Sequence, residues 1–220
     1  DATGHIVTQF DFDVAKAAGA CAVFLRAGSV TRDTGEIYED LAWDYNSAEG
    51  PKRLPCGSYW YFRPQHSPLK QAQFYANLLA GKDMTLPAVL DYESNDLLLS
   101  KVACSAAGKL FIDELERLTG KSAMVYTRKT FWDPNLGRTT WAGSRQLWTA
   151  HYTLDAPWIP MDWTTWAVWQ YTSHGDGHKY GAQSASIDMD RAKDGFVVSG
   201  PTLEERVAEL ERRVAALEAA

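Results

Sequence analysis

Short apolar runs alternate with amphipathic stretches through the first two thirds of the chain. Four runs have the length of buried strands: 20–26, 57–62, 86–90 and 123–127. Apolar residues recur at helical spacing over 12–19, 67–81 and 97–118, and a glycine stands at or just after the end of each stretch. Strands that alternate with helices predict a parallel sheet covered by helices.

The last third of the chain has a different pattern. Runs at 147–152, 167–172 and 186–190 predict strands, but no helical spacing separates them. The segments between the elements are predicted to be loops or turns: 27–50 with a short helix at 38–45, then 128–146, 155–166 and 174–181. The predicted fold class is α/β, a modified (β/α) barrel with an irregular last third.

The C-terminal residues form a separate unit. Apolar residues at 203, 207, 210, 214 and 217 alternate spacings of four and three, and Thr202 with Glu205 forms a capping box. This is the pattern of a parallel coiled coil, which predicts self-association through residues 203–217. The alternative is a single amphipathic helix that packs back on the domain. We therefore divide the chain into a domain at 1–198 and a helical tail at 199–220.

Composition and charge narrow the class of partner. The net charge is −6, with no basic run outside the tail, which argues against nucleic acid. No apolar segment approaches membrane-spanning length, so no membrane partner is expected. Cys21, Cys56 and Cys104 have no metal-binding spacing, and Cys21 and Cys104 are predicted to be small core residues. Nine Trp and ten Tyr suit either packing or a sugar-binding cleft.

Two carboxylates follow the apolar run at 86–90. Asp91 and Glu93 are two residues apart, so on an extended chain their side chains point to the same side. Carboxylates this close raise one another's pKa, which makes one a candidate proton donor and the other a candidate anion. In a parallel β/α barrel the C-terminal ends of the strands carry the active site, and both acids lie at such an end.

The histidines indicate a metal site only weakly. His174 and His178 lie on a glycine-rich stretch that has no third ligand nearby, and His151 is expected to be structural. We therefore expect no metal and no cofactor.

Several motifs in this order resemble the glycoside hydrolase family 25 muramidases, which are lysozymes of bacterial cell walls. Residues 10–19 are similar to the family's D-W-x-x-x-K-x-A-G helix, and 87–93 to its P-x-x-L-D-x-E strand. Further pieces resemble the family at 23–27, 57–64, 71–74, 125–127, 147–152, 169–172 and 187–190. The resemblance covers residues 1–195 and leaves out the tail. Trp60 replaces a usual His, and Asp190 replaces a usual Asn.

The resemblance implies hydrolysis of the β-1,4 bond between N-acetylmuramic acid and N-acetylglucosamine in bacterial peptidoglycan. It implies Glu93 as general acid, with Asp91 stabilising charge and raising the pKa of Glu93. Asp188 and Asp1 would orient the substrate or its N-acetyl group, which is a candidate internal nucleophile. Asp1 matches the aspartate of the family's opening G-I-D-x-S strand, which implies that the preceding residues are missing here. The residues implied to hold sugar are Tyr61, Tyr126, Trp148, Tyr152 and Gln170.

Two alternatives remain open at this point. One is another (β/α)-barrel glycosidase, such as a chitinase-like enzyme, although Leu86 and Val89 occupy two acid positions of the pattern D-x-x-D-x-D-x-E. The other is a non-catalytic wall-binding module. The expected place of action is the extracellular cell wall, reached by a secreted enzyme or by a phage-encoded lysin.

Overall fold

The structure, a computed structural model, describes residues 9–196. The predicted helical tail at 199–220 and Asp1 lie outside the described residues, so the coiled coil and the domain boundary remain predictions.

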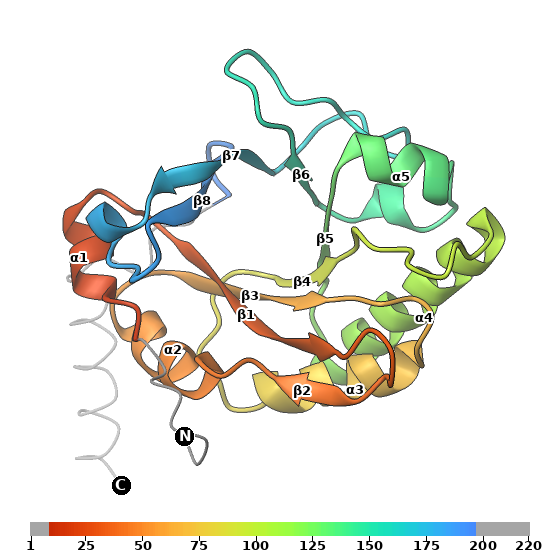
Figure 1. Cartoon of the computed structure of the whole chain (residues 1–220), viewed down its shortest axis with the longest axis horizontal. Coiled ribbons are helices and arrows are strands. Elements are labelled where there is room, and N and C mark those ends of the chain that lie inside the picture. The colour runs from red at the N-terminus through yellow and green to blue at the C-terminus, as the bar shows by residue number, and fades with distance from the viewer. Residues whose placement is uncertain (1–8, 197–220) are drawn as a thin grey trace, which may run out of the picture.

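One curved sheet of eight strands forms the centre of the described chain (Figure 1). Its order is β2-β1-β3-β4-β5-β6-β7-β8. The parallel strands are β1 (Val23–Val30), β3 (Cys56–Tyr61), β4 (Ala88–Asp91), β5 (Met124–Thr127), β6 (Leu147–Ala150) and β7 (Val168–Asp176). The edge strands β2 (Ile37–Glu39) and β8 (Ser186–Ala192) run antiparallel to β1 and β7. The predicted α/β class is confirmed, but within residues 9–196 the sheet is open rather than a closed barrel.

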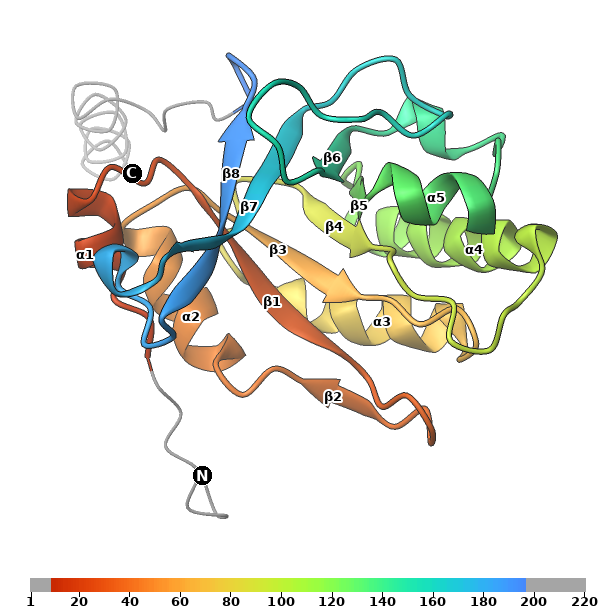
Figure 2. The same ribbon diagram turned by 45° about the horizontal axis from the view of Figure 1, so that its top comes forward.

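Helices cover the outer face of this sheet. They are α1 (Phe12–Ala17), α2 (Trp43–Glu49), α3 (Pro68–Leu79), α4 (Lys101–Thr119) and α5 (Lys129–Asn135), with 3₁₀ turns η1 (Gly50–Lys52), η2 (Ala142–Ser144) and η3 (His178–Tyr180). α3 and α4 lie side by side beneath β3 and β4 (Figures 1 and 2). Ser67 and Ser100 cap these two helices, each accepting a hydrogen bond from a backbone N–H of the first turn.

Tyr92 connects the sheet to α4. Its side chain is fully buried, and its hydroxyl donates a hydrogen bond of 2.9 Å to the backbone oxygen of Cys104. The ring packs edge-on against Phe62 at 5.0 Å between centroids. Because neighbouring side chains on a strand alternate in direction, this outward anchor turns Asp91 and Glu93 toward the inner face.

Several predicted elements differ from those observed. β1 starts at Val23 and continues to Val30. The segment 27–50 also contains β2, and the short helix predicted there at 38–45 lies later, as α2. Residues 128–146, predicted as a loop, contain α5, while β7 extends into the predicted turn as far as Asp176. Cys21 is exposed in the connection before β1, so its prediction as a core residue was wrong, whereas Cys104 is buried as predicted.

Gly108 lets α4 approach the sheet closely. A Cβ at this position would lie 2.9 Å from Tyr92 Cε1 and 3.0 Å from Trp141 Cζ2, and both rings are buried. Neither ring has room to move in a close-packed interior. Gly108→Ala is therefore expected to lower the free energy of unfolding by roughly 1–3 kcal/mol, although alanine favours a helix by about 1 kcal/mol.

Urea unfolding of both variants measures this effect. Ala106→Gly at an exposed position of the same helix is the control, because it isolates the helix propensity of alanine over glycine. A Gly108→Ala protein more stable than wild type would contradict the packing described here.

Candidate active site

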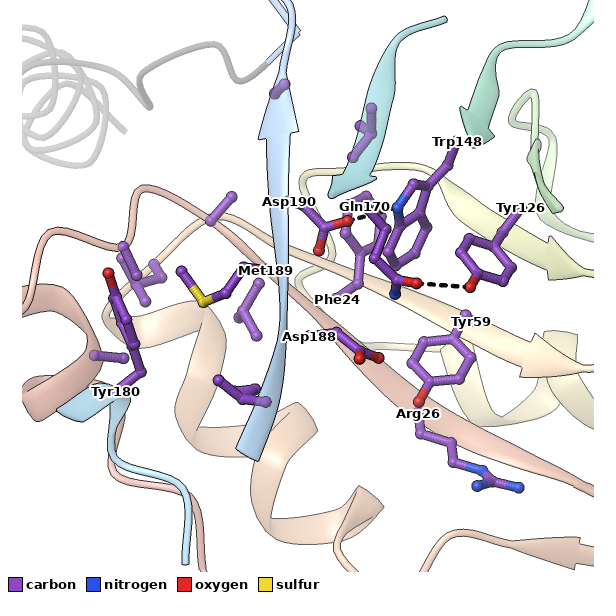
Figure 3. A pocket seen from close by; sticks show the side chains of 18 of the residues that line it. Phe24, Arg26, Tyr59, Tyr126, Trp148, Gln170, Tyr180, Asp188, Met189 and Asp190 are labelled. Atoms are coloured by element: carbon purple, nitrogen blue, oxygen red, sulfur yellow. Dashed lines mark hydrogen bonds between the residues drawn. The ribbon is translucent and has the colours of Figure 1, made fainter. Parts of the chain in front are cut away.

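A cavity of about 530 Å³ opens on the inner face of the sheet (Figure 3). Four carboxyl groups reach it: Asp91 and Glu93 from the end of β4, and Asp188 and Asp190 from β8. Aromatic side chains from β1, β3, β5 and β6 form much of the remaining wall. Acids that are remote in the sequence are therefore assembled by the pairing order of the sheet.

Asp91 and Glu93 share the inner face, as their spacing predicted. Asp91 is only 5% exposed, and its Oδ1 is buried with no hydrogen-bond partner in the described chain. Burial raises the pKa of Asp91 well above its usual value, and the charge of Glu93 raises it further. The pair therefore retains a proton at a pH at which two free carboxyls are both ionised.

Glu93 is the more accessible member of the pair. Burial is the main cause of its raised pKa, Asp188 adds to it, and the positive charge of Arg128 opposes it. The two carboxyls are close enough for the charge of one to oppose ionisation of the other. Burial therefore raises the pKa of both carboxyls, and their proximity adds to the effect.

Asp188 and Asp190 both open into the cavity from β8. Burial raises the pKa of Asp188, and the charge of His174 lowers it. Asp190 Oδ1 accepts a hydrogen bond of 2.7 Å from Trp148 Nε1 (Figure 3). Desolvation of its carboxyl raises the pKa of Asp190 to about 7, with the Trp148 bond opposing and the charge of Asp188 adding to the shift.

Gln170, the cross-strand partner of Asp190, organises a cluster of tyrosines in the cavity. Its Oε1 accepts hydrogen bonds from the hydroxyls of Tyr126 at 2.9 Å and Tyr152 at 3.0 Å. Trp148 packs edge-on against Tyr126 at 4.8 Å between ring centroids. Because both phenols donate to the oxygen, the amide nitrogen of Gln170 is left to donate to a ligand.

Comparison with known families identifies this arrangement. The family model described as Glycosyl hydrolases family 25 matches residues 5–179. The chain belongs to this family.

Related proteins and structures agree with the family assignment. The chain is 25% identical over 202 residues to "Lysozyme M1" of Streptomyces globisporus. This match covers 85% of the chain and 65% of the relative, so the chain spans less than two thirds of that relative's length. It is 27% identical over 191 residues to "N,O-diacetylmuramidase" of Chalaropsis sp, covering 81% and 88%. The structure of a family GH25 lysozyme from Aspergillus fumigatus is similar, with a TM-score of 0.67, 27% identity, and 90% and 91% of the two chains covered.

Most of the site residues implied by the family resemblance line this cavity. The lining includes Tyr61, Asp91, Glu93, Tyr126, Trp148, Gln170 and Asp188. Tyr152 is joined to it through Gln170. Asp1 lies outside the described residues and outside the segment matched by the family 25 model. Trp60, which replaces the family's usual His, is fully buried and donates from Nε1 to Gln71.

The cavity residues that were not among the predicted site residues include Arg26, Tyr59 and Asp190. Spacing could have indicated two of them, because Tyr59 precedes Tyr61 by two residues and Asp190 follows Asp188 by two. Arg26 lies in the predicted strand at 20–26 but matched no catalytic pattern. Within residues 9–196, no group of three or more His, Cys, Asp or Glu is placed to hold a metal, and no helix is long and apolar enough to cross a membrane.

The raised pKa of Asp190 predicts a pH-dependent stability. An aspartate in an unfolded chain titrates near pH ~4, so this fold favours the protonated form of Asp190. The stability that this group contributes is fully present below pH ~4 and is lost as the pH rises through about 7. Asp190→Asn keeps an oxygen that can accept from Trp148 but has no charge. The variant is expected to be more stable than wild type at pH ~8 and equal to it at pH ~4.

Urea unfolding at the two pH values measures the difference. Asp155→Asn, in an exposed loop, is the matched control. The same difference in unfolding free energy at both pH values would rule out a titrating Asp190.

Proposed function

We propose that this chain is an N-acetylmuramidase that hydrolyses the β-1,4 bond between N-acetylmuramic acid and N-acetylglucosamine in bacterial peptidoglycan. The observation that carries the proposal is the pair of carboxyls at the end of β4 that faces the cavity of a family 25 chain, where burial raises the pKa of both. Relatives named as a lysozyme and an N,O-diacetylmuramidase support the choice of substrate.

Glu93 is the proposed general acid. Glycosidic cleavage needs one protonated carboxyl to assist the leaving oxygen and a second group to stabilise the oxocarbenium-like transition state. Glu93 faces the cavity and is more exposed than Asp91, so it is the member of the pair that reaches a bound sugar. Its burial supports a raised pKa, which keeps it protonated at mildly acidic pH.

Asp91 acts behind Glu93 in this proposal. Its buried position leaves little room for direct contact with the substrate, and its main effect is on the proton shared by the pair. When Glu93 gives its proton to the leaving oxygen, a proton on Asp91 stabilises the new carboxylate beside it. This role differs from a permanently ionised Asp91.

Asp188 is the proposed partner of the substrate's N-acetyl group. It opens into the cavity from β8, where a carboxylate can accept from the acetamido N–H and orient that group toward the anomeric carbon. The acetamido oxygen is then a candidate internal nucleophile. We assign the same orienting role to Asp1 from the family resemblance.

The sugar rings are proposed to lie against the aromatic side chains that line the cavity. Tyr61, Tyr126 and Trp148 line the cavity, and flat aromatic faces suit the apolar faces of sugars. Tyr152 is 55% exposed beside Gln170, and the Gln170 amide supplies a fixed donor. Trp148 is held from the other side by Asp190, so its contribution includes packing as well as contact.

The proposed setting is the bacterial cell wall, reached by secretion or as a phage-encoded lysin. Peptidoglycan is the proposed partner. Residues 203–217 would add self-association through a parallel coiled coil, which sedimentation of the full chain beside a chain ending at 198 would test.

Glu93→Gln tests the assignment of the acid. Removal of a general acid costs roughly 10²- to 10⁴-fold in rate, so lysis of cell walls is expected to fall at least ~100-fold. Thermal unfolding should remain close to wild type, since Gln has nearly the shape of Glu. Glu36→Gln, on the exposed turn before β2, is the matched control. Lysis retained by Glu93→Gln would require another acid.

Analysis of the new reducing ends tests the bond that is cut. Purified peptidoglycan digested by the wild-type chain is expected to release muramic acid reducing ends. N-acetylglucosamine ends would indicate a glucosaminidase, and chitin cleavage without wall cleavage a chitinase-like enzyme. Binding to walls without any new ends would favour a non-catalytic wall-binding module.

A further inference from the structure

Arg128 lies near Glu93 at the C-terminal edge of the sheet, close enough for its charge to act on that carboxyl, but the two side chains form no ion pair. The β4–β5 register pairs Asp91 with Tyr126, and the backbone N–H of Tyr92 continues the ladder to the oxygen of Tyr126. Two residues further along each chain, Glu93 and Arg128 are therefore counterparts. This places a cation next to the proposed acid.

The direction of Arg128 follows from the alternation along β5. Tyr126 lines the cavity, and Thr127 points away from it, donating from Oγ1 to the backbone oxygen of Tyr92. Arg128 keeps an extended backbone, with φ −127° and ψ 146°, so its side chain returns to the side of Tyr126. Its positive charge also lowers the pKa of both Glu93 and Tyr152, as expected of a group between them.

The guanidinium of Arg128 is exposed, and no side chain or backbone oxygen within residues 9–196 accepts a hydrogen bond from it. Nearby cations are engaged. Arg26 bonds the hydroxyl of Tyr38 and lies 3.7 Å from Asp40, and Arg63 pairs with Asp96. Lys129, the next residue, pairs with Asp133 at 2.6 Å. Arg128 thus differs from its neighbours in having no carboxylate of the described chain to bind.

We propose that Arg128 is a specificity-determining residue that binds a carboxylate of the substrate next to the cleaved bond. The inference rests on the proposed muramidase function. A guanidinium binds a carboxylate through two parallel N–H···O bonds, which add geometric specificity to the attraction of the charges. N-acetylmuramic acid differs from N-acetylglucosamine by a lactyl ether that carries a carboxyl group. In intact walls that carboxyl is amide-linked to a stem peptide, which has carboxylates of its own.

A matched set of substrates tests the proposal. Peptide-free glycan strands carry free lactyl carboxylates, and the same strands amidated with methylamine are neutral there. Intact peptidoglycan carries the stem-peptide carboxylates instead. Arg128→Gln is expected to lower kcat/KM on the peptide-free acid strands roughly 10- to 100-fold, mainly through KM, and to leave the amidated strands nearly unchanged. The wild-type chain should itself prefer the acid form over the amidated form.

Two control variants accompany Arg128→Gln. Arg128→Lys keeps the charge but loses the bidentate geometry, so it should recover only part of the preference. Lys129→Gln removes the adjacent charge, which is already paired with Asp133, and should keep the wild-type preference. If Arg128→Gln lowered kcat/KM on intact peptidoglycan but not on the peptide-free acid strands, the stem peptide would be the source of the carboxylate.

Equal losses on acid and amidated strands would overturn the proposal. In that case Arg128 acts only through Glu93, and the alkaline limb of the pH profile, which reports ionisation of the general acid, would move to higher pH on both substrates. Unchanged kinetics in Arg128→Gln would overturn it as well.

Binding separates this inference from the proposed function. Calorimetric titration of the two glycans into the Glu93→Gln protein, with and without Arg128→Gln, needs no turnover. Tighter binding of the acid strands that depends on Arg128 would support the inference even if the wild-type chain cut no wall. Identical binding of both strands to both proteins would refute it while leaving muramidase activity intact.

Discussion

The outward anchoring of Tyr92 is the constraint on which the site depends. A strand offers its side chains alternately to its two faces, so a residue locked on one face fixes its neighbours on the other. Tyr92 is locked by its bond to the backbone oxygen of Cys104 and by close packing against α4 at Gly108. Helix packing on the outside of the sheet thereby orients the two carboxyls on the inside.

The same geometry explains why the acids keep protons. The end of parallel strand β4 and the antiparallel edge strand β8 together add four carboxyls to one cavity. Burial opposes ionisation of each group, and their mutual charge opposes it further. Two cations oppose this effect at different members of the β4 pair, since Arg26 lowers the pKa of Asp91 and Arg128 lowers that of Glu93. Residues on β1 and directly after β5 therefore influence the balance within the acid pair.

The sequence predicted the parts of the fold that follow local rules. α3 and α4 begin at serine caps, and glycines with positive φ follow them at Gly81 and Gly120, so their limits were visible. The limits of strands that depend on the close approach of a neighbouring strand were not visible in the sequence. β1 continues through Gly28, where a Cβ would lie 2.2 Å from the backbone oxygen of Tyr38. β7 continues through Gly175, packed against Met189, and both glycines suggested turns.

Prediction of the site had the same limits. Asp91, Glu93 and Asp188 stood in motifs and line the cavity. Asp190 stood in a motif as well, but its bond to Trp148, like the place of Arg128 near Glu93, depends on neighbours across the sheet. α5 was missed because its Trp and Pro residues are typical of loops, although Phe131 and Trp132 are buried. Pairing between distant segments is what a single sequence does not display.

Gln170 gives the cavity a polarity that acid and base do not change. Two tyrosine hydroxyls occupy the lone pairs of its carbonyl oxygen, and the amide group has no proton to gain or lose near neutral pH. The Gln170 amide therefore offers a donor that does not titrate, directly across the β7–β8 ladder from Asp190. The carboxyls of the cavity change their charge with the medium, whereas this amide continues to select ligands by their oxygen acceptors. A titrating acid and a fixed donor thus stand side by side on neighbouring strands.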